Sequence, residues 1–335
     1  RHKPYSDPSS TAIDRFSRRD RRSDREIMQG FRWKGMRHFL EIDDLETQEL
    51  ELVLKLSAAT NPPKVLADQG VALLFEKPSG RTRNSMEMAV VQLGGHPMYI
   101  QPEELGIGSR ETAEDVVRVM AGYHTVLAAR VFDHGLLEQM AATNSVPIVN
   151  LLSDIAHPMQ ALADLLTIEQ EIGLGKVGKV AYVGDANNVW RSLAIGCSML
   201  GIQTSVASPA GHGPNSPDLE RVLIAGGSVQ VTDDPSEAVE GADVVYTDVW
   251  TSMGQEDEKS QRLDAFSRYT VNSDLMAETN SNSIFMHCLP AHRGEEVTDE
   301  VIESPRSKVF LQAQNRMHSA RGLLSWIVGE VAKHG

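Results

Sequence analysis

Residues 173–184, GLGKVGKVAYVG, hold the clearest boundary in this chain of 335 residues. Glycine at positions 173 and 175 predicts a turn. The apolar run at 179–183 that follows has the length and composition of a buried strand. Strand-like and helix-like segments alternate before this turn, and the same alternation begins again after it. Such alternation predicts parallel strands covered by helices on both faces, so we expect an α/β fold of two doubly wound parallel-sheet domains.

The same apolar patterns, followed outward from this boundary in both directions, predict the other helices and strands. Short apolar runs predict strands at 71–75, 125–131, 146–150, 179–183, 204–207, 229–231, 244–247 and 284–287. Apolar residues at helical spacing predict helices over 43–59, from Ser79 to the Gly94–Gly95 pair, after His157-Pro158, over 189–200, and from about Ala313 to Val331. We expect a leader at 1–35, a first domain at 36–172, a second domain at 173–312, and a C-terminal helix at 313–335 that packs back on the first domain.

The first 35 residues differ in charge from the rest of the chain. They carry a net charge of +5, whereas the remaining 300 residues carry −19, within a total of −14. Their weak apolar periodicity predicts a disordered leader or an extended translation start. The alternative, which gives these residues a specific function, is a basic arm that binds RNA or a membrane surface. The acidic body argues against nucleic acid as the main partner.

Composition excludes several classes of protein. Hydrophobic residues make up 41% of the chain, enough for substantial cores. No apolar run approaches the roughly 18 residues that span a bilayer, and no apolar core follows the basic N-terminus, as a signal peptide would require. The two cysteines, Cys197 and Cys288, form neither a disulfide framework nor a metal-ligand spacing. We therefore expect a cytoplasmic protein with no membrane partner and no bound metal, in which Cys197 is packed in a core.

Polar clusters follow several expected strands, and in open parallel sheets ligands bind at the carboxyl ends of the strands. The first cluster is Ser79-Gly80-Arg81-Thr82-Arg83, at a helix start. A helix N-terminus offers unpaired N–H groups and positive potential, and the arginine fork matches phosphate oxygens. The cluster favours a phosphate site, although a capped helix with solvated arginines would have the same pattern.

The second cluster is His157-Pro158-Met159-Gln160. A histidine and a glutamine one turn apart can both donate to one carbonyl oxygen, and donors of this kind stabilise developing negative charge. A histidine at a helix start can also be an ordinary cap.

Two more clusters follow later strands. Asp248 ends a strand, where a carboxylate can hold an ammonium group, and Ser252-Met253-Gly254 has the composition of a mobile loop. His287-Cys288-Leu289-Pro290 ends another strand. A cysteine beside a histidine suggests a nucleophile, but no activating base is evident, and a passive or proton-relaying role fits equally well.

In this order, the motifs resemble those of the ornithine carbamoyltransferases. The resemblance covers about residues 36–333. It includes Ser-x-Arg-Thr-Arg, His-Pro-x-Gln, Asp-x-x-x-Ser-Met-Gly, His-Cys-Leu-Pro and a late Asn315-Arg316-Met317-His318. It implies transfer of the carbamoyl group of carbamoyl phosphate to the side-chain amine of L-ornithine, which gives citrulline and phosphate. It also implies that no cofactor is needed and that the enzyme is a homotrimer with shared active sites.

The resemblance also assigns substrates to residues. Carbamoyl phosphate would be bound by the first domain and its neighbours, through Ser79, Gly80, Arg81, Thr82, Arg130, His157, Gln160, Cys288, Leu289 and Arg316. Ornithine would be bound through the second domain by Asn188, Asp248, Ser252 and Met253. The catalytic residues would be Arg130, His157, Asp248 and Cys288, with His157 on the carbonyl oxygen and Asp248 on the α-amino group.

Two positions depart from the family pattern. Gly80 stands where threonine is common, which removes one hydroxyl from the phosphate site. Gly106 stands where a polar residue is common, in a loop that can reach a neighbouring subunit in the family, so a side-chain contact from that neighbour is in question.

Several other functions remain open. Putrescine, aspartate or an acylated ornithine could be the acceptor. A nicotinamide-dependent dehydrogenase would need Gly-x-Gly-x-x-Gly after a strand, which Gly184-Asp185-Ala186-Asn187-Asn188 lacks. An inactive regulatory relative would show a broken motif, and only Gly80 points that way.

Overall fold

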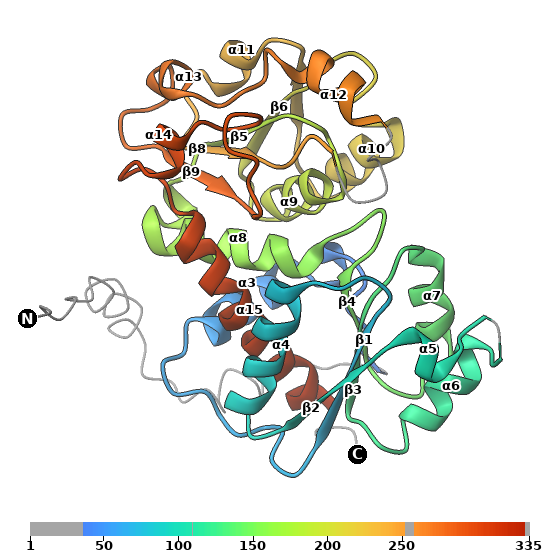
Figure 1. The fold of residues 1–335 in the computed structure, drawn as a ribbon. Coiled ribbons are helices and arrows are strands. Elements are labelled where there is room, and N and C mark those ends of the chain that lie inside the picture. The colour runs from blue at the N-terminus through green and yellow to red at the C-terminus, as the bar shows by residue number, and fades with distance from the viewer. Residues whose placement is uncertain (1–35, 109, 252–257, 332–335) are drawn as a thin grey trace, which may run out of the picture.

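The computed structural model describes residues 36–108, 110–251 and 258–331. Two parallel sheets, one above the other in Figure 1, form the centres of two α/β domains. This arrangement confirms the expected fold class. The expected leader at 1–35 lies outside the described residues.

The first domain is built on a sheet with the strand order β2-β1-β3-β4, in which all pairs are parallel. Its strands are β1 (Gly70–Phe75), β2 (His96–Ile100), β3 (Val126–Arg130) and β4 (Ile148–Leu152). Its helices are η1 (Ile42–Asp44), α3 (Thr47–Ser57), α4 (Gly80–Gln92), α5 (Pro102–Leu105), α6 (Ala113–Met120) and α7 (His134–Ala142).

The second domain has the strand order β7-β6-β5-β8-β9, also with parallel pairs. Its strands are β5 (Lys179–Val183), β6 (Gln203–Ala207), β7 (Val229–Thr232), β8 (Val244–Thr247) and β9 (Ile284–His287). Its helices are η2 (Leu174–Lys176), α9 (Asn188–Met199), α10 (Ser216–Ile224), α11 (Pro235–Val239), α12 (Lys259–Phe266), α13 (Ser273–Ala277) and α14 (Asp299–Ile302).

The alternation of side chains along β1 explains why helices cover both faces of the first sheet. Val71 and Leu73 face a large apolar core that includes α3 and α4, whereas Ala72 and Leu74 face a separate core with α6 and α7. Successive strand residues point to opposite faces. A strand that is apolar at every position therefore needs cover on both sides, as the second sheet also shows.

Two long helices join the domains (Figure 1). Helix α8 (Pro158–Glu171) is buried from residue 158 to 168, and α15 (Val309–Val331) packs against α3, α4 and α8. The large core is continuous from α15 and α8 to β5, β6 and β8 of the second sheet. Helix α15 begins at Val309, before the expected start near Ala313. The return of the last segment to the first domain places residues from both ends of the chain beside each other.

Some elements differ from the expected ones. Strand β2 was not expected, because it is an edge strand that contains Pro97 and alternates exposed with partly buried residues, so it has no continuous apolar run. Among the described residues, no helix is both long enough and apolar enough to cross a membrane.

Candidate active site

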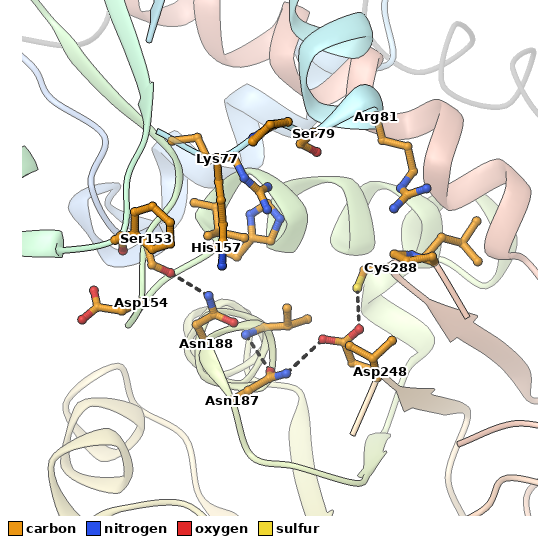
Figure 2. Close-up of a pocket in the computed structure, with 18 of the residues that line it drawn as sticks. Lys77, Ser79, Arg81, Ser153, Asp154, His157, Asn187, Asn188, Asp248 and Cys288 are labelled. Carbon is orange, nitrogen blue, oxygen red and sulfur yellow. Dashed lines mark hydrogen bonds between the residues drawn. The ribbon is translucent and has the colours of Figure 1, made fainter. Parts of the chain in front are cut away.

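A cavity of about 790 Å³ lies between the two domains and takes its lining from both (Figure 2). Its walls come from the segments that follow β1, β3, β4, β5, β8 and β9. In each sheet the chain order reverses at one place, between β1 and β3 and between β5 and β8. Ligands of open parallel sheets bind at the carboxyl ends of the strands at these switch points. The two switch points of this protein face one cavity.

The start of α4 forms one wall of the cavity. The Ser79 side chain caps the helix, because its Oγ accepts a hydrogen bond from the Thr82 backbone N–H at 3.4 Å. Gly80 and Arg81 follow on the cavity lining. A Cβ atom added to Gly80 would meet no heavy atom within 4 Å, so the glycine is not required by packing. The first turn of the helix therefore offers backbone donors and a cation at the cavity.

Two guanidinium groups donate to the buried Thr82 hydroxyl, and the charge of a third, Arg81, acts on both. Thr82 Oγ1 accepts from Arg130 Nη1 at 3.4 Å and from Arg316 Nη2 at 2.5 Å. Burial, together with repulsion by Arg316 and Arg81, lowers the pKa of Arg130 to about 10. Burial also lowers the pKa of Arg316. Like charges held this close favour the binding of an anion, which would offset their repulsion.

His157 lines the cavity at the start of α8, and Gln160 lies one turn further along the helix. The His157 backbone N–H donates to Ser192 Oγ at 2.9 Å, which ties the start of α8 to α9. Burial, followed by repulsion from Arg316 and Arg130, holds the pKa of His157 well below its usual value. The imidazole is therefore neutral at physiological pH and can donate one hydrogen bond without adding another charge.

Polar groups of the second domain form the opposite wall. Asp248 Oδ2 accepts from Asn187 Nδ2 at 2.9 Å, and Asp248 Oδ1 accepts from the Cys288 thiol at 3.0 Å. Asn187 also caps α9 through its Oδ1. The neighbouring Asn188 donates from Nδ2 to the Ser153 carbonyl oxygen at 2.7 Å, and Figure 2 shows these contacts around the cavity. The wall presents a carboxylate opposite the arginine cluster.

Cys288 does not have the surroundings of a nucleophile. Burial, and then the Asp248 carboxylate, raise the pKa of its thiol well above the usual value, so the sulfur carries its proton at neutral pH. The next residue, Leu289, has a φ of 57°, and its N–H donates to His287 Nδ1 at 2.9 Å. This left-handed backbone is uncommon for leucine. The strand end is thus held in a fixed shape beside the cavity.

One grouping here has the spacing of metal ligands. The ligand atoms of Asp248, His287 and Cys288 lie within 4.8 Å of one another. Both ring nitrogens of His287 are already used, because Nδ1 accepts from Leu289 and Nε2 pairs with Glu296 at 3.0 Å. A metal would have to break one of these bonds and remove the thiol proton, so the grouping carries no metal assignment.

Most of the expected site residues meet at this cavity. Those on its lining are Ser79, Gly80, Arg81, Arg130, His157, Asn188, Asp248, Cys288, Leu289 and Arg316. Thr82 and Gln160 are not part of the lining, and they are buried, with 2% and 1% of their surfaces exposed. Ser252 and Met253 lie outside the described residues.

Sequence reasoning gave no role to other lining residues, such as Lys77, Phe132, Ser153, Asp154, Asp185 and Asn187. Their positions directly after β1, β3, β4 and β5 are the signal that could have indicated them.

Gly106 has a structural reason to be glycine. It ends α5 with a φ of 64°, and a Cβ atom there would lie 2.3 Å from Arg110 Nε. A side chain at this position would be strained and would displace the Arg110 side chain. The local turn, as it stands, does not admit the polar side chain that is common in the resembling family.

Both domains match known families. Residues 37–170 match the "Aspartate/ornithine carbamoyltransferase, carbamoyl-P binding domain", and residues 177–327 match the "Aspartate/ornithine carbamoyltransferase, Asp/Orn binding domain". The chain belongs to the aspartate/ornithine carbamoyltransferase family. The resemblance noted in the sequence is therefore confirmed.

Relatives within this carbamoyltransferase family cover nearly the whole chain. An ornithine carbamoyltransferase of Haloquadratum walsbyi is 45% identical over 88% of this chain and 98% of its own length. One of Hyperthermus butylicus is 46% identical over 87% of this chain and 97% of its own length. The solved structure of ornithine carbamoyltransferase from Pyrococcus furiosus has a TM-score of 0.83 and 42% identity, and covers 88% of this chain and 98% of its own.

Proposed function

We propose that this protein transfers the carbamoyl group of carbamoyl phosphate to the side-chain amine of L-ornithine and releases citrulline and phosphate. The observation that carries the proposal is one cavity with an arginine cluster on the first domain and Asp248 on the second. The carbamoyltransferase relatives, which are named for ornithine, favour ornithine over putrescine as the acceptor. In this proposal residues 36–172 bind carbamoyl phosphate, 173–312 bind ornithine, and 313–335 return to the first domain.

Carbamoyl phosphate would lie with its phosphate group at the start of α4. The backbone N–H groups that follow Ser79 in the first turn of α4, together with the Arg81 guanidinium, are suited to phosphate oxygens. Arg130 and Arg316 would reach both the phosphate and the carbamoyl group, since both touch Thr82 at the base of this wall. Binding of the doubly negative carbamoyl phosphate would relieve the repulsion among Arg81, Arg130 and Arg316. This relief would contribute to the affinity for carbamoyl phosphate.

Ornithine would bind against the second domain. Asp248 is suited to the α-ammonium group, and Asn188 to the α-carboxylate, because both line the same wall. Ser252 and Met253 belong to this half of the proposal by resemblance. The side-chain amine would then extend toward the carbamoyl carbon, beside Cys288 and Leu289.

The reaction requires a neutral amine, since an ammonium group has no lone pair to attack with. An amine with a pKa near 10 is mostly protonated at neutral pH, and desolvation between the two domains favours the neutral form. Its nitrogen forms a bond to the carbamoyl carbon, and the carbonyl oxygen takes the negative charge. Arg130, the neutral His157 and the Thr82 hydroxyl would stabilise that oxygen. Collapse of the intermediate re-forms the carbonyl bond and breaks the carbon–oxygen bond to phosphate, and the departing phosphate takes the extra proton from the nitrogen.

In this proposal Cys288, whose thiol pKa is raised by burial and by Asp248, lines the site and forms no covalent bond with the substrate. No group carrier is needed, because carbamoyl phosphate is already activated. Much of the acceleration would then come from alignment of the two substrates and from the arranged charges.

The proposal also includes a homotrimer in the cytoplasm. Exposed apolar side chains on the adjacent elements α4 and β2, which are Met88, Val91 and Met98, support contact with another subunit. The cysteines, Cys197 and Cys288, are both free thiols, which fits a reducing compartment. Light scattering after size-exclusion chromatography would measure the mass, and a monomeric mass at micromolar concentration would contradict this part of the proposal.

Citrulline formation tests the reaction directly. We would supply carbamoyl phosphate with ornithine, putrescine, aspartate or N-acetylornithine in parallel, and measure the carbamoylated product and phosphate. Turnover with ornithine alone is the expected result. Turnover with putrescine would agree with the carbamoyl phosphate site at the start of α4 but would refute the binding of an α-ammonium group by Asp248. No turnover with any amine would refute the proposed activity.

A further inference from the structure

Asp164 is a buried carboxyl group that has no role in the reaction described so far. It lies on α8 with none of its surface exposed. Its Oδ1 accepts from Gln160 Nε2 at 2.8 Å and from Gln312 Nε2 at 2.7 Å, and no ion pair among the described residues includes it. Burial raises its pKa to about 7, although both amide donors act in the opposite direction. Burying a carboxyl group without an ion-pair partner costs folding free energy. We therefore looked for a function that this group could have.

Asp164 determines which way the Gln160 amide points. Asp164 Oδ1 accepts hydrogen bonds from two amide groups, as an ionised carboxylate does and as the carbonyl oxygen of a protonated carboxyl also does, so the NH₂ group of Gln160 faces it. The other end of the amide, Gln160 Oε1, then points away from Asp164. That oxygen is buried, and no described residue donates a hydrogen bond to it. Asp164 Oδ2 is also buried without a donor among the described residues, so the pair leaves two acceptor atoms, and the bond to Asp164 fixes the orientation of Gln160 Oε1.

Gln312 holds the same carboxyl group from α15. Its Nε2 donates to Tyr246 Oη at 3.0 Å as well as to Asp164, and its Oε1 accepts from the His287 backbone N–H at 2.9 Å. Both ends of this amide are in use, so it cannot turn without losing bonds. Asp164 is thus fixed from two helices and from the strand end that carries Cys288.

The buried group lies close to the cavity. His157, one turn before Gln160, lines the cavity. Burial dominates the pKa shifts of Arg316 and Cys288, which also line it, and the Asp164 charge acts on both, favouring the charged guanidinium and the protonated thiol. Charge effects of this kind require short separations.

We propose that Asp164 is a positioning residue that makes the site selective for a carbamoyl group over an acyl group of similar size. The inference rests on the proposed function and on the family resemblance, which places Gln160, buried one turn from the cavity-lining His157, among the residues that bind carbamoyl phosphate. With its NH₂ held by Asp164, Gln160 presents Oε1, which accepts from the carbamoyl NH₂. An acetyl group has a methyl group at that place and cannot donate. The neutral His157 then donates to the carbonyl oxygen, and Gln160 Oε1 accepts from the nitrogen.

Acetyl phosphate is the probe for this selectivity. We would measure kcat/KM for carbamoyl phosphate and the inhibition constant of acetyl phosphate at pH 8, where Asp164 is mostly ionised. Asp164→Leu removes the acceptor, keeps the volume, and replaces a buried polar group by an apolar one. The Gln160 amide can then turn, and kcat/KM should fall about tenfold, as expected for one lost hydrogen bond. The inhibition constant of acetyl phosphate should change by less than about twofold, since acetyl phosphate never made this bond.

Asp164→Asn is the matched control, because its Oδ1 still accepts from both amides. It should keep most of the selectivity. A thermal melt of each variant reports whether it is folded, and Asp164→Ala is the second variant if the leucine substitution prevents folding.

A double-mutant cycle separates a positioning role from a merely structural one. In a Gln160→Ala background, Asp164→Leu should have little further effect on selectivity. An equal loss in both backgrounds would overturn the inference, as would unchanged selectivity in a folded Asp164→Leu protein, and in both cases the wild type would still form citrulline. Failure of the wild type to form citrulline would count against the proposed function itself.

Discussion

Asp248→Asn removes a negative charge from the cavity wall that we propose binds ornithine, with little change in shape. Asp248 is buried at the end of β8, where it accepts from Asn187 and from the Cys288 thiol. An asparagine can keep the bond from Asn187 with its own oxygen and turn its NH₂ toward the sulfur, which is a weak acceptor. The variant should therefore fold, and its effect should come from the lost charge.

The size of that effect follows from the burial of the carboxylate. Two unit charges about 4 Å apart interact by about 4 kcal/mol at an effective dielectric constant of about 20. Dehydration of both groups reduces the net contribution to about 1.5–3 kcal/mol, as for other hydrogen bonds to charged groups. We therefore expect KM for ornithine to rise roughly 10- to 150-fold. Carbamoyl phosphate lies on the other wall in our proposal, so its affinity should change less than about threefold.

The assay measures the two substrates separately. Steady-state kinetics with saturating carbamoyl phosphate give KM for ornithine, and calorimetry without ornithine gives the affinity for carbamoyl phosphate. Asp154→Asn is a useful control, because Asp154 also lines the cavity but has no role in the proposed reaction. Equal weakening of both substrates by Asp248→Asn would refute the assignment of Asp248 to ornithine.

Three further substitutions test other parts of the site. Arg81→Ala removes a charged phosphate partner, and calorimetry should show carbamoyl phosphate binding at least about tenfold weaker; near-normal affinity would remove Arg81 from the phosphate site. Cys288→Ser keeps a donor to Asp248, so activity should stay measurable, and a carbamoyl–cysteine adduct in mass spectrometry of the wild type would contradict a lining role. Arg191→Ala leaves Asp218 without its ion-pair partner, whereas Glu41 keeps its pair with Arg221. Denaturant unfolding should show a loss of about 1.5–3 kcal/mol, and a loss below about 1 kcal/mol would mean that the ion pairs behave like exposed ones.

The strands that sequence patterns predicted best are the ones buried on both faces. Strands β5, β8 and β9 have the expected bounds, because each is a short apolar run between polar residues. Strand β2 was not predicted, because it contains Pro97 and alternates exposed with partly buried residues, and so lacks a continuous apolar run. The short helices α10 to α14 were also not predicted. The alternation of elements was enough to give the two-domain fold.

The candidate site was predictable to the extent that it follows the strand ends. Asp248 could be chosen because the carboxyl ends of parallel strands meet at one edge, whereas Arg130 was assigned through the family resemblance. Asp164 was not chosen, although Gln160 lies only one turn before it on the same helix, because a carboxyl group in an apolar helix gives no sign of its second partner, Gln312, which is 148 residues away in the chain. Pattern analysis along the chain does not identify partners at that separation.

The return of α15 to the first domain has a consequence for the order in which the protein is made. Arg316, on α15, completes the arginine cluster that begins with residues after β1 and β3. The same helix covers α3 and α4. A ribosome that has released only the first domain has therefore produced a half without its last guanidinium and with part of its core exposed. Synthesis must therefore reach the final helix before the arginine cluster of the cavity is complete.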